Sequence, residues 1–572
     1  MSTPSATPRL APSPQTSAPL VLLTLLVGGY LLAWFALSPW GEFAINDDWS
    51  YATTARVLCE TGRFVPHSWT SMPLLTHVAW GQLFCNPDAF SMGQLRLSTL
   101  VMGVLGGLGA WLLTRELGGS RWHALLATAL LMLNPIHHGL SYSFMTDVPF
   151  TTWLTWTTWA LAKAIRRDSA FCWVVGVLMT IACALSRQMA LAPALAFAVV
   201  WGMTAPVRLT RLLMALTPLT ACLLALWAIE AWMRHQDILP ALYHDKSIEI
   251  RDNLRQPSAL IKSMLGSASV FLLYLGLFLA PALLLVRSRP RRNVLLLVAS
   301  LTGAAVMAVR FVASRKWMPV SGNVLLPHGL GPLTLPDTFL QGINLPPPLP
   351  TWIWMLATGI AVVGGLFLLW LVTSAAQSAI REQLQRHALP PQRRASHFVL
   401  LTCLAYMAPM LVGNGNLDRY TLPLLPLLAA WLLTQTATPS DGTDEPRASA
   451  LGMSPSVVAT GAVVMVALMG TFTLLASHDH IAWLKARHQA AQTLLAQGVL
   501  PQHMDAGFEF SGQHLYDDHY QRSAGKSWWW IQGDDHKVTN GPMDGYTSIG
   551  QVTYNTWLPP GQRAVHMLKR TP

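Results

Sequence analysis

Apolar runs long enough to cross a membrane alternate with short polar segments along most of this 572-residue chain. A membrane-spanning helix needs roughly 20 mostly apolar residues. The pattern predicts thirteen spans, at residues 18–39, 97–114, 122–140, 148–164, 170–185, 189–205, 212–230, 264–286, 294–312, 351–373, 397–413, 421–437 and 454–476. The fold class predicted for residues 18–476 is therefore an all-α polytopic membrane protein.

The two ends of the chain differ from this apolar middle. Residues 1–17 are rich in Pro, Ser and Thr and are predicted to be a disordered tail, because such a composition cannot form a packed core. Residues 477–572 begin with a helical pattern and continue with three strand-like runs, KSWWWI, TSIGQVTYNTW and RAVHML, separated by turn residues. We expect a small α+β domain there.

Charge is scarce, and its distribution indicates how the chain is oriented. Only 11% of the residues are charged, against roughly 25% in soluble domains, yet the formal net charge is +11. The excess of Lys and Arg falls on the side of the predicted helices that carries the N-terminal tail. The positive-inside rule places that side in the cytoplasm. Residues 477–572 and the loops 40–96, 231–263 and 313–350 are then outside. Because the basic residues are scattered between apolar runs, nucleic acid is not an expected partner.

The cysteines and histidines give little indication of a metal site. Cys59 and Cys85 share one predicted outer loop and could form a disulfide there, whereas the other four cysteines, Cys172, Cys183, Cys222 and Cys403, fall in apolar runs. His67 and His77 are ten residues apart with no acid between them. No cofactor is certain from the sequence, and a divalent metal remains an open alternative.

Three acids lie where an outer loop meets a predicted helix. Asp47 and Asp48 follow the first span, and Asp147 lies at the end of the short outer turn 141–147. Carboxylates near hydrocarbon are costly and are often functional, and a positioned Asp can act as a general base. The alternative is that these residues only cap helix N-termini.

Cations on the same side are candidates for holding a phosphate group. They are Arg187, Arg310, Arg315, Lys316 and Arg419. The guanidinium group of arginine binds phosphate oxygens with two parallel hydrogen bonds. For each of these residues the alternative is a side chain that extends to the lipid head groups.

For the other polar and aromatic groups on the outer side, we favour structural roles. Trp528-Trp529-Trp530 could stack on sugar rings, but we favour a role in anchoring or in a core. His137 and His138 are expected in the head-group zone. The pairs Asp517-Asp518 and Asp534-Asp535 could bind a cation or an acceptor, although acids in turns are usually solvated.

Several of these motifs together resemble a known enzyme class. Asn46-Asp47-Asp48-Trp49-Ser50-Tyr51-Ala52, Thr61-Gly62-Arg63-Phe64, Asp147, and the motif from Asp418-Arg419-Tyr420 to Pro426 are similar to those of polytopic GT-C glycosyltransferases. The similarity covers residues 18–475. More narrowly, the chain is similar to the bacterial branch related to protein O-mannosyltransferases and the lipid A aminoarabinose transferase. These enzymes belong to glycosyltransferase families 39 and 83.

The resemblance implies transfer of a sugar from a polyprenyl-phosphate donor to a lipid, glycan or protein acceptor. The reaction would be inverting and would take place at the periplasmic face of a bacterial inner membrane. Asp47 corresponds to the catalytic carboxylate, Asp48 replaces the Glu that follows it in the family, and Asp147 is the supporting acid.

One departure from the family concerns the donor phosphate. Many relatives have Lys-Pro-Pro in the first outer loop, where this chain has Ser71-Met72-Pro73-Leu74. The phosphate contact is therefore assigned to Arg187, with Arg315 or Lys316 as second choice, and Arg419 is a further candidate.

The competing functional class is a transporter or flippase for a lipid-linked sugar. Such a protein is expected to place ionisable residues near the middle of its spans. Here they lie at the outer ends of the predicted helices. This distribution favours chemistry at the membrane surface.

Overall fold

The structure is a computed structural model that describes residues 17–202, 209–286, 303, 311, 313–384, 389–413, 417–435, 454–521 and 529–571. Its α-helices are α1 Ala18–Leu37, α2 Asp48–Thr61, α3 Leu75–Gln82, α4 Met92–Glu116, α5 Arg121–Met132, α6 Pro135–Leu140, α7 Asp147–Arg167, α8 Ala170–Ala184, α9 Leu191–Gly202, α10 Leu209–His235, α11 Asp245–Arg255, α12 Pro257–Phe278, α13 Ala280–Leu285, α15 Pro336–Phe339, α16 Thr351–Leu384, α17 Pro391–Val412, α18 Leu424–Thr434, α19 Pro455–Ala496 and α20 Phe508–Leu515. Short 3-10 helices occur at η1 Gln188–Ala190, η2 Asp418–Thr421 and η3 Pro501–His503. The strands are β1 Leu325–Leu326, β2 Gly329–Leu330, β3 Met504–Asp505, β4 His536–Thr539, β5 Tyr546–Trp557 and β6 Pro560–Arg570.

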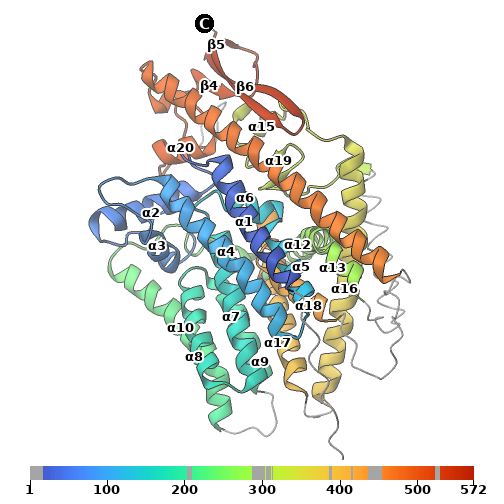
Figure 1. Ribbon diagram of the computed structural model, residues 1–572. Coiled ribbons are helices and arrows are strands. Elements are labelled where there is room, and N and C mark those ends of the chain that lie inside the picture. The colour runs from blue at the N-terminus through green and yellow to red at the C-terminus, as the bar shows by residue number, and fades with distance from the viewer. Residues whose placement is uncertain are drawn as a thin grey trace, which may run out of the picture.

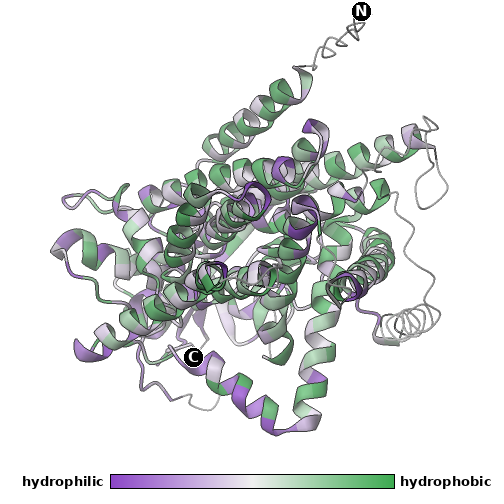
Figure 2. Cartoon of the chain, turned by 90° about the horizontal axis from the view of Figure 1, so that it is seen from below, coloured by the Kyte–Doolittle hydropathy of each residue, from purple (hydrophilic) through white to green (hydrophobic). Residues whose placement is uncertain are grey.

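The long helices form one bundle. Helix α7 packs between α4 and α8, and α12 packs along α16 (Figure 1). Apolar residues cover most of the long helices, and hydrophilic residues gather at helix ends and in connecting segments (Figure 2). A core of buried apolar side chains extends through the bundle.

Among the described residues, seven helices are long and apolar enough to cross a membrane: α1, α4, α10, α12, α16, α17 and α19. Three shorter apolar segments, Ala170–Ala184, Gln188–Gly202 and Leu424–Thr434, add to them. The count of thirteen stays a prediction, since the predicted span 294–312 and the tail 1–16 lie outside the described residues, apart from single positions in the span.

Proline divides two of the predicted spans. Residues 122–140 form α5 and α6, which meet at Asn134-Pro135, and residues 264–286 form the end of α12 and then α13, which contains Pro281. Proline lacks the backbone N–H that an uninterrupted helix needs. The Asn134 side chain accepts a hydrogen bond from the Ile136 N–H at 2.9 Å and so begins a new helix at this point.

The last predicted span and the helix expected after it are one element. Helix α19 runs for 42 residues from Pro455 to Ala496, because no Gly or Pro interrupts the chain around residue 477. It connects the bundle to a four-stranded sheet of order β3-β4-β6-β5. Strands β5 and β6 agree with two of the strand-like runs. The third prediction is wrong at residues 529–531, which form a bend and irregular structure.

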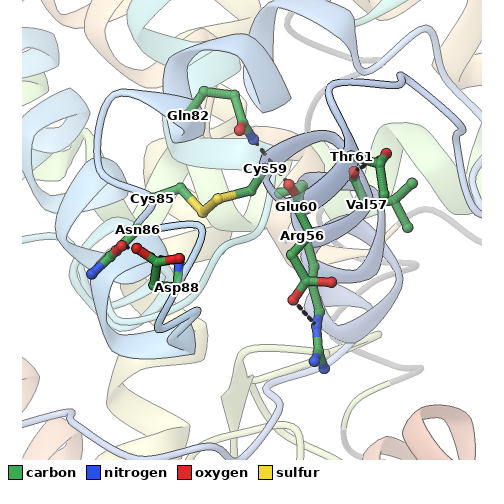
Figure 3. Close-up of a disulfide and its surroundings, with 10 residues drawn as sticks. Arg56, Val57, Cys59, Glu60, Thr61, Gln82, Cys85, Asn86 and Asp88 are labelled. Atoms are coloured by element: carbon green, nitrogen blue, oxygen red, sulfur yellow. Dashed lines mark hydrogen bonds and ion pairs between the residues drawn. A yellow bond between two sulfur atoms is a disulfide. The ribbon is translucent and has the colours of Figure 1, made fainter.

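The sheet lies at the top of the molecule in Figure 1, and α20 lies to its lower left; α2, which contacts α20, and α3 follow below on the left. There a disulfide joins Cys59 of α2 to Cys85, which follows α3 (Figure 3). This pairing answers the question that the sequence left open. The remaining four cysteines are free and buried, as expected of small apolar side chains.

Candidate active site

The loop between α1 and α2 carries Asp47 and is held from two sides. From the bundle, the guanidinium group of the buried Arg96 on α4 donates hydrogen bonds to the carbonyls of Pro39 and Gly41, at 2.6 and 2.9 Å. A third bond goes to the carbonyl of Phe43. Three hydrogen bonds from one buried arginine keep the first half of the loop in place.

The second half of the loop is held by the C-terminal part of the chain. Glu509 of α20 accepts a hydrogen bond from the Asn46 N–H at 3.3 Å and forms an ion pair of 2.6 Å with Arg487 of α19. Arg487 also donates to the Ala44 carbonyl at 3.1 Å. Both charged side chains are buried. Residues more than 400 positions apart in sequence thus position the residue before Asp47.

Four charged side chains meet at this loop and alternate in sign. An Arg419 nitrogen lies 3.2 Å from an Asp47 oxygen, and a second Arg419 nitrogen lies 4.0 Å from Asp147. Asp147 is in turn 3.2 Å from Arg187. The structure therefore brings together two of the three predicted catalytic acids and two of the predicted cations, from four separate segments of the sequence.

Exposure distinguishes the members of this charge cluster. The Asp47 side chain is 17% exposed, whereas that of Asp147 is fully buried. Among the described residues, neither Asp147 oxygen accepts a hydrogen bond, and Nε and Nη1 of Arg419 have no hydrogen-bond acceptor. Asp47 is therefore the carboxylate that a molecule entering from outside can reach, and Arg419 retains donors for a further oxygen.

Asp48 points away from the charge cluster. Its carboxylate accepts hydrogen bonds from the Ile45 N–H at 2.7 Å and the Phe144 N–H at 3.1 Å, and the residue is fully buried. Burial raises the pKa of Asp48 from 3.8 to about 7. These contacts connect the first outer loop to the segment that precedes α7, which supports a structural role for this acid.

Helix capping does not explain the other two acids. Asp47 precedes α2, but its side chain makes no capping hydrogen bond. Helix α7 begins at Asp147, and its N-cap residue, Thr146, also lacks such a bond.

The segment of the first outer loop that replaces Lys-Pro-Pro lies beside the charge cluster. The Ser71 carbonyl accepts a hydrogen bond from Gln188 at 3.2 Å, and the Met72 sulfur accepts one from Thr146 at 3.5 Å. Thr146 also accepts a bond of 2.9 Å from Arg187. Arg187 therefore lies where the loop, α7 and η1 meet, next to the position at which relatives are expected to have a lysine.

Sequence reasoning missed Trp69. Its indole N–H donates a hydrogen bond to Asp47 at 3.0 Å. A lone tryptophan in a polar loop has no distinguishing spacing, so only the fold could identify it.

Trp69 belongs to an aromatic cluster beside the loop. The buried members include Trp49, Phe508, Trp529 and Trp530. This agrees with the core role favoured for the tryptophan run, of which Trp528 lies outside the described residues.

The remaining predicted cations are not joined to the charge cluster. Arg315 and Lys316 are exposed and form no ion pair within the described part of the chain. Arg310 lies outside the described residues. Asp418, from the same motif as Arg419, is buried and accepts hydrogen bonds from the N–H groups of Asn323, Val324 and Leu325, so it anchors the third outer loop.

The histidines and paired acids have structural partners. His67 accepts a hydrogen bond from the Trp69 N–H at 3.1 Å, and His77 bonds the Phe144 carbonyl. Within the described residues, no group of three His, Cys, Asp or Glu could hold a metal ion. Asp518 accepts a bond from Ser68, and Asp534 pairs with Lys537 and Arg570.

The head-group position expected of His137 and His138 is wrong. Both are buried, and His138 bonds Ser477 of α19 at 2.9 Å. The cause is the break at Pro135, which turns the short helix α6 inward against α19.

The solved structures that the chain is similar to are distant from it in sequence. ArnT from Cupriavidus metallidurans bound to undecaprenyl phosphate is 12% identical, with 97% of this chain and 98% of that one covered and a TM-score of 0.44. The Archaeoglobus fulgidus oligosaccharyltransferase is 15% identical over 82% and 55%, with a TM-score of 0.40. The S. cerevisiae protein O-mannosyltransferase Pmt1-Pmt2 complex bound to the sugar donor is 11% identical over 40% and 35%, with a TM-score of 0.32.

Sequence comparison gives a more direct result. No curated protein matches the chain. The family model described as dolichyl-phosphate-mannose-protein mannosyltransferase matches residues 82–233, from α3 through α10. This stretch includes Asp147 and Arg187. The match covers less than half of the chain and includes neither the acidic motif at Asp47 nor the Asp-Arg-Tyr motif. Over residues 82–233 the chain is similar to this family, in agreement with the resemblance to polytopic GT-C glycosyltransferases.

Proposed function

We propose that the protein transfers a sugar from a polyprenyl-phosphate donor to an acceptor at the periplasmic face of a bacterial inner membrane. The single observation that carries the proposal is the charge cluster in which the buried Arg419, Asp147 and Arg187 lie next to the partly exposed Asp47. It combines a carboxylate that an acceptor can reach with two cations suited to a phosphate.

In this proposal Asp47 is the general base. It takes the proton of the acceptor hydroxyl or amine while that group bonds to the anomeric carbon. The bond from the anomeric carbon to the phosphate oxygen breaks, and the configuration inverts. Asp147 is the supporting acid, because its charge keeps Arg187 and Arg419 side by side.

Arg419 and Arg187 stabilise the phosphate as it leaves. Negative charge develops on the leaving oxygen, and guanidinium groups already held near that position stabilise it without further reorganisation. The unused donors of Arg419 support its role as the main contact. Arg315 and Lys316 are second to this pair because they are exposed and unconnected to Asp47.

The first test compares Asp47→Asn with Asp88→Asn in proteoliposomes. Asp88 is an exposed acid of the same outer loop, so its variant is a matched control. Each protein receives a panel of polyprenyl-phosphate sugars and an extract of envelope acceptors, and mass spectrometry detects the product. Asp47→Asn is expected to lower transfer by at least about 10²-fold. Full activity of this variant, with unchanged thermal unfolding, would rule out Asp47 as the base.

A second comparison tests the phosphate contact. Lysine keeps the charge but cannot bridge two acids with a planar fork. Arg419→Lys is therefore expected to lower transfer by about 10- to 100-fold, and Arg315→Lys by less than twofold. The reverse order would move the phosphate site to the third outer loop.

The flippase alternative is tested with sealed vesicles. A flippase moves the carrier-linked sugar across the bilayer without releasing the carrier phosphate. If this movement occurs and no acceptor is glycosylated, the proposed transferase function is wrong.

A further inference from the structure

Both oxygens of Asp47 have a fixed partner. Oδ2 lies 3.2 Å from Arg419, and Oδ1 accepts a hydrogen bond of 3.0 Å from the Trp69 indole. A base accelerates proton transfer only when it is aimed at the proton it removes. With one contact, the carboxylate could rotate about its Cβ–Cγ bond. The two contacts, from Arg419 and from Trp69, fix the plane of the carboxylate.

The C-terminal part of the chain holds the Trp69 ring. Trp530 meets it edge to face with ring centroids 5.1 Å apart, and Tyr516 does so at 5.8 Å. Next to Trp69, the Ser68 hydroxyl donates a hydrogen bond of 2.7 Å to Asp518. Edge-to-face contacts at these distances are favourable for aromatic pairs. The first outer loop is therefore attached to the C-terminal part of the chain through both Ser68 and Trp69.

The backbone conformation of Trp530 indicates that the surrounding residues fix its position against Trp69. Trp530 has a φ of +55°, in the left-handed region that bulky residues rarely adopt. Such a conformation persists only where the surroundings require it. Close packing supports this view, since a Cβ atom on Gly512 would lie 2.4 Å from the ring of Trp49 in the same cluster.

We propose that Trp69 is a positioning residue for Asp47 and that the C-terminal segment sets its orientation through Trp530 and Tyr516. The inference rests on the proposed function in assigning Asp47 as the base. In this arrangement the outer C-terminal segment completes the site without contributing a reacting group. The geometry of the base thereby depends on the docking of residues 508–521 and 529–530.

The first test does not depend on turnover. 6-Fluorotryptophan is introduced at position 69 alone by codon suppression, and its ¹⁹F signal is recorded in the full-length protein. Asp47→Asn and Trp530→Ala are each expected to move this signal. Tyr516→Ala serves if Trp530→Ala does not fold. A signal unchanged by Asp47→Asn and by the aromatic variants would overturn the proposal, even if the protein transfers sugar.

The second test is kinetic and uses a matched tryptophan. Trp69→Phe keeps a ring but removes the indole N–H, and it is expected to lower kcat by about 10- to 100-fold with the donor KM changed less than twofold. Trp80→Phe removes an N–H that donates to the Ser98 carbonyl at 3.0 Å and is expected to retain activity within twofold. Equal activity of Trp69→Phe and wild type would exclude the positioning role. A wild type without transferase activity would refute only the proposed function, because the ¹⁹F test stands alone.

Discussion

At the scale of single residues, Asp47 and Asp48 are adjacent in sequence but lie in different environments. Asp47 faces Arg419, Trp69 and solvent, whereas Asp48 is enclosed by backbone N–H groups. Successive side chains at a helix start point in different directions, so one acid can serve chemistry and the next can brace the loop. The sequence motif alone presents both as equivalent candidates.

The raised pKa of Asp48 predicts a pH-dependent stability. Its pKa moves from 3.8 to about 7 because of burial, so the folded state binds more protons than the unfolded state between these values. Its contribution to stability therefore falls as the pH rises from about 4 to about 7. The Asp48→Asn variant has no charge to bury at this position. From pH 5 to pH 8, its free energy of unfolding relative to that of the wild type is expected to rise by a few kcal/mol at most. Thermal unfolding at both pH values measures the gain, and an equal difference between the two proteins at both would contradict it.

At the scale of elements, the bundle depends on a close crossing of α12 and α16. A Cβ atom on Gly364 would lie 2.3 Å from the Gly276 carbonyl oxygen, and one on Gly276 would lie 2.2 Å from the Gly365 nitrogen. Glycine at such a crossing lets two helix backbones touch, which is a common way to pack helices in a membrane. The third outer loop connects to α16, so this crossing also supports the region around Asp418.

Gly364→Ala is expected to weaken this crossing. The added methyl group would overlap backbone atoms of Gly276 on α12. Overpacking of this kind lowers the free energy of unfolding by about 1–3 kcal/mol. Gly359→Ala on the same helix is the control, because no atom lies within 4 Å of its added Cβ and alanine favours a helix. Thermal unfolding in detergent compares the two. A loss of stability in both variants, or in neither, would show that close contact is not the cause.

At the scale of the whole molecule, the C-terminal segment and the first outer loop form one unit. Arg487 and Glu509 are both buried, and together they bond Ala44 and Asn46, which precede Asp47. Helix α19 carries Arg487 as a rigid continuation of its bundle portion. The position of Asp47 therefore depends on the packing of segments from both ends of the chain.

Glu509→Gln is expected to destabilise the protein and to lower transfer. It leaves Arg487 buried without its ionic partner, and breaking a buried pair from one side costs about 3–5 kcal/mol. Glu60→Gln is the control, because its pair with Arg56 is exposed and such pairs contribute less than about 1 kcal/mol. Thermal unfolding and the transfer assay are measured together. If Glu509→Gln unfolds like the wild type, the loop does not depend on this pair.

The sequence by itself was sufficient for features that arise from local composition. Long apolar runs can be stabilised only as helices in hydrocarbon, so the bundle was predictable, and strands β5 and β6 followed from alternation and turns. The motifs around Asp47, Asp147 and Arg419 also marked three of the segments that the fold brings together. The continuous helix α19 was not predicted, although its cause is local, and the inward turn of α6 depends on packing against α19 as well as on Pro135.

Only the tertiary structure decided how these residues are combined. The association of Asp47 with Arg419 joins positions 372 residues apart, and no local pattern encodes such a distance. The separation of Asp47 from Asp48, the exposure of Arg315 and Lys316, and the contact from Trp69 all follow from which surfaces pack together. The sequence shows the chemical type of each residue, whereas the burial of a side chain and the groups that it contacts depend on the whole fold.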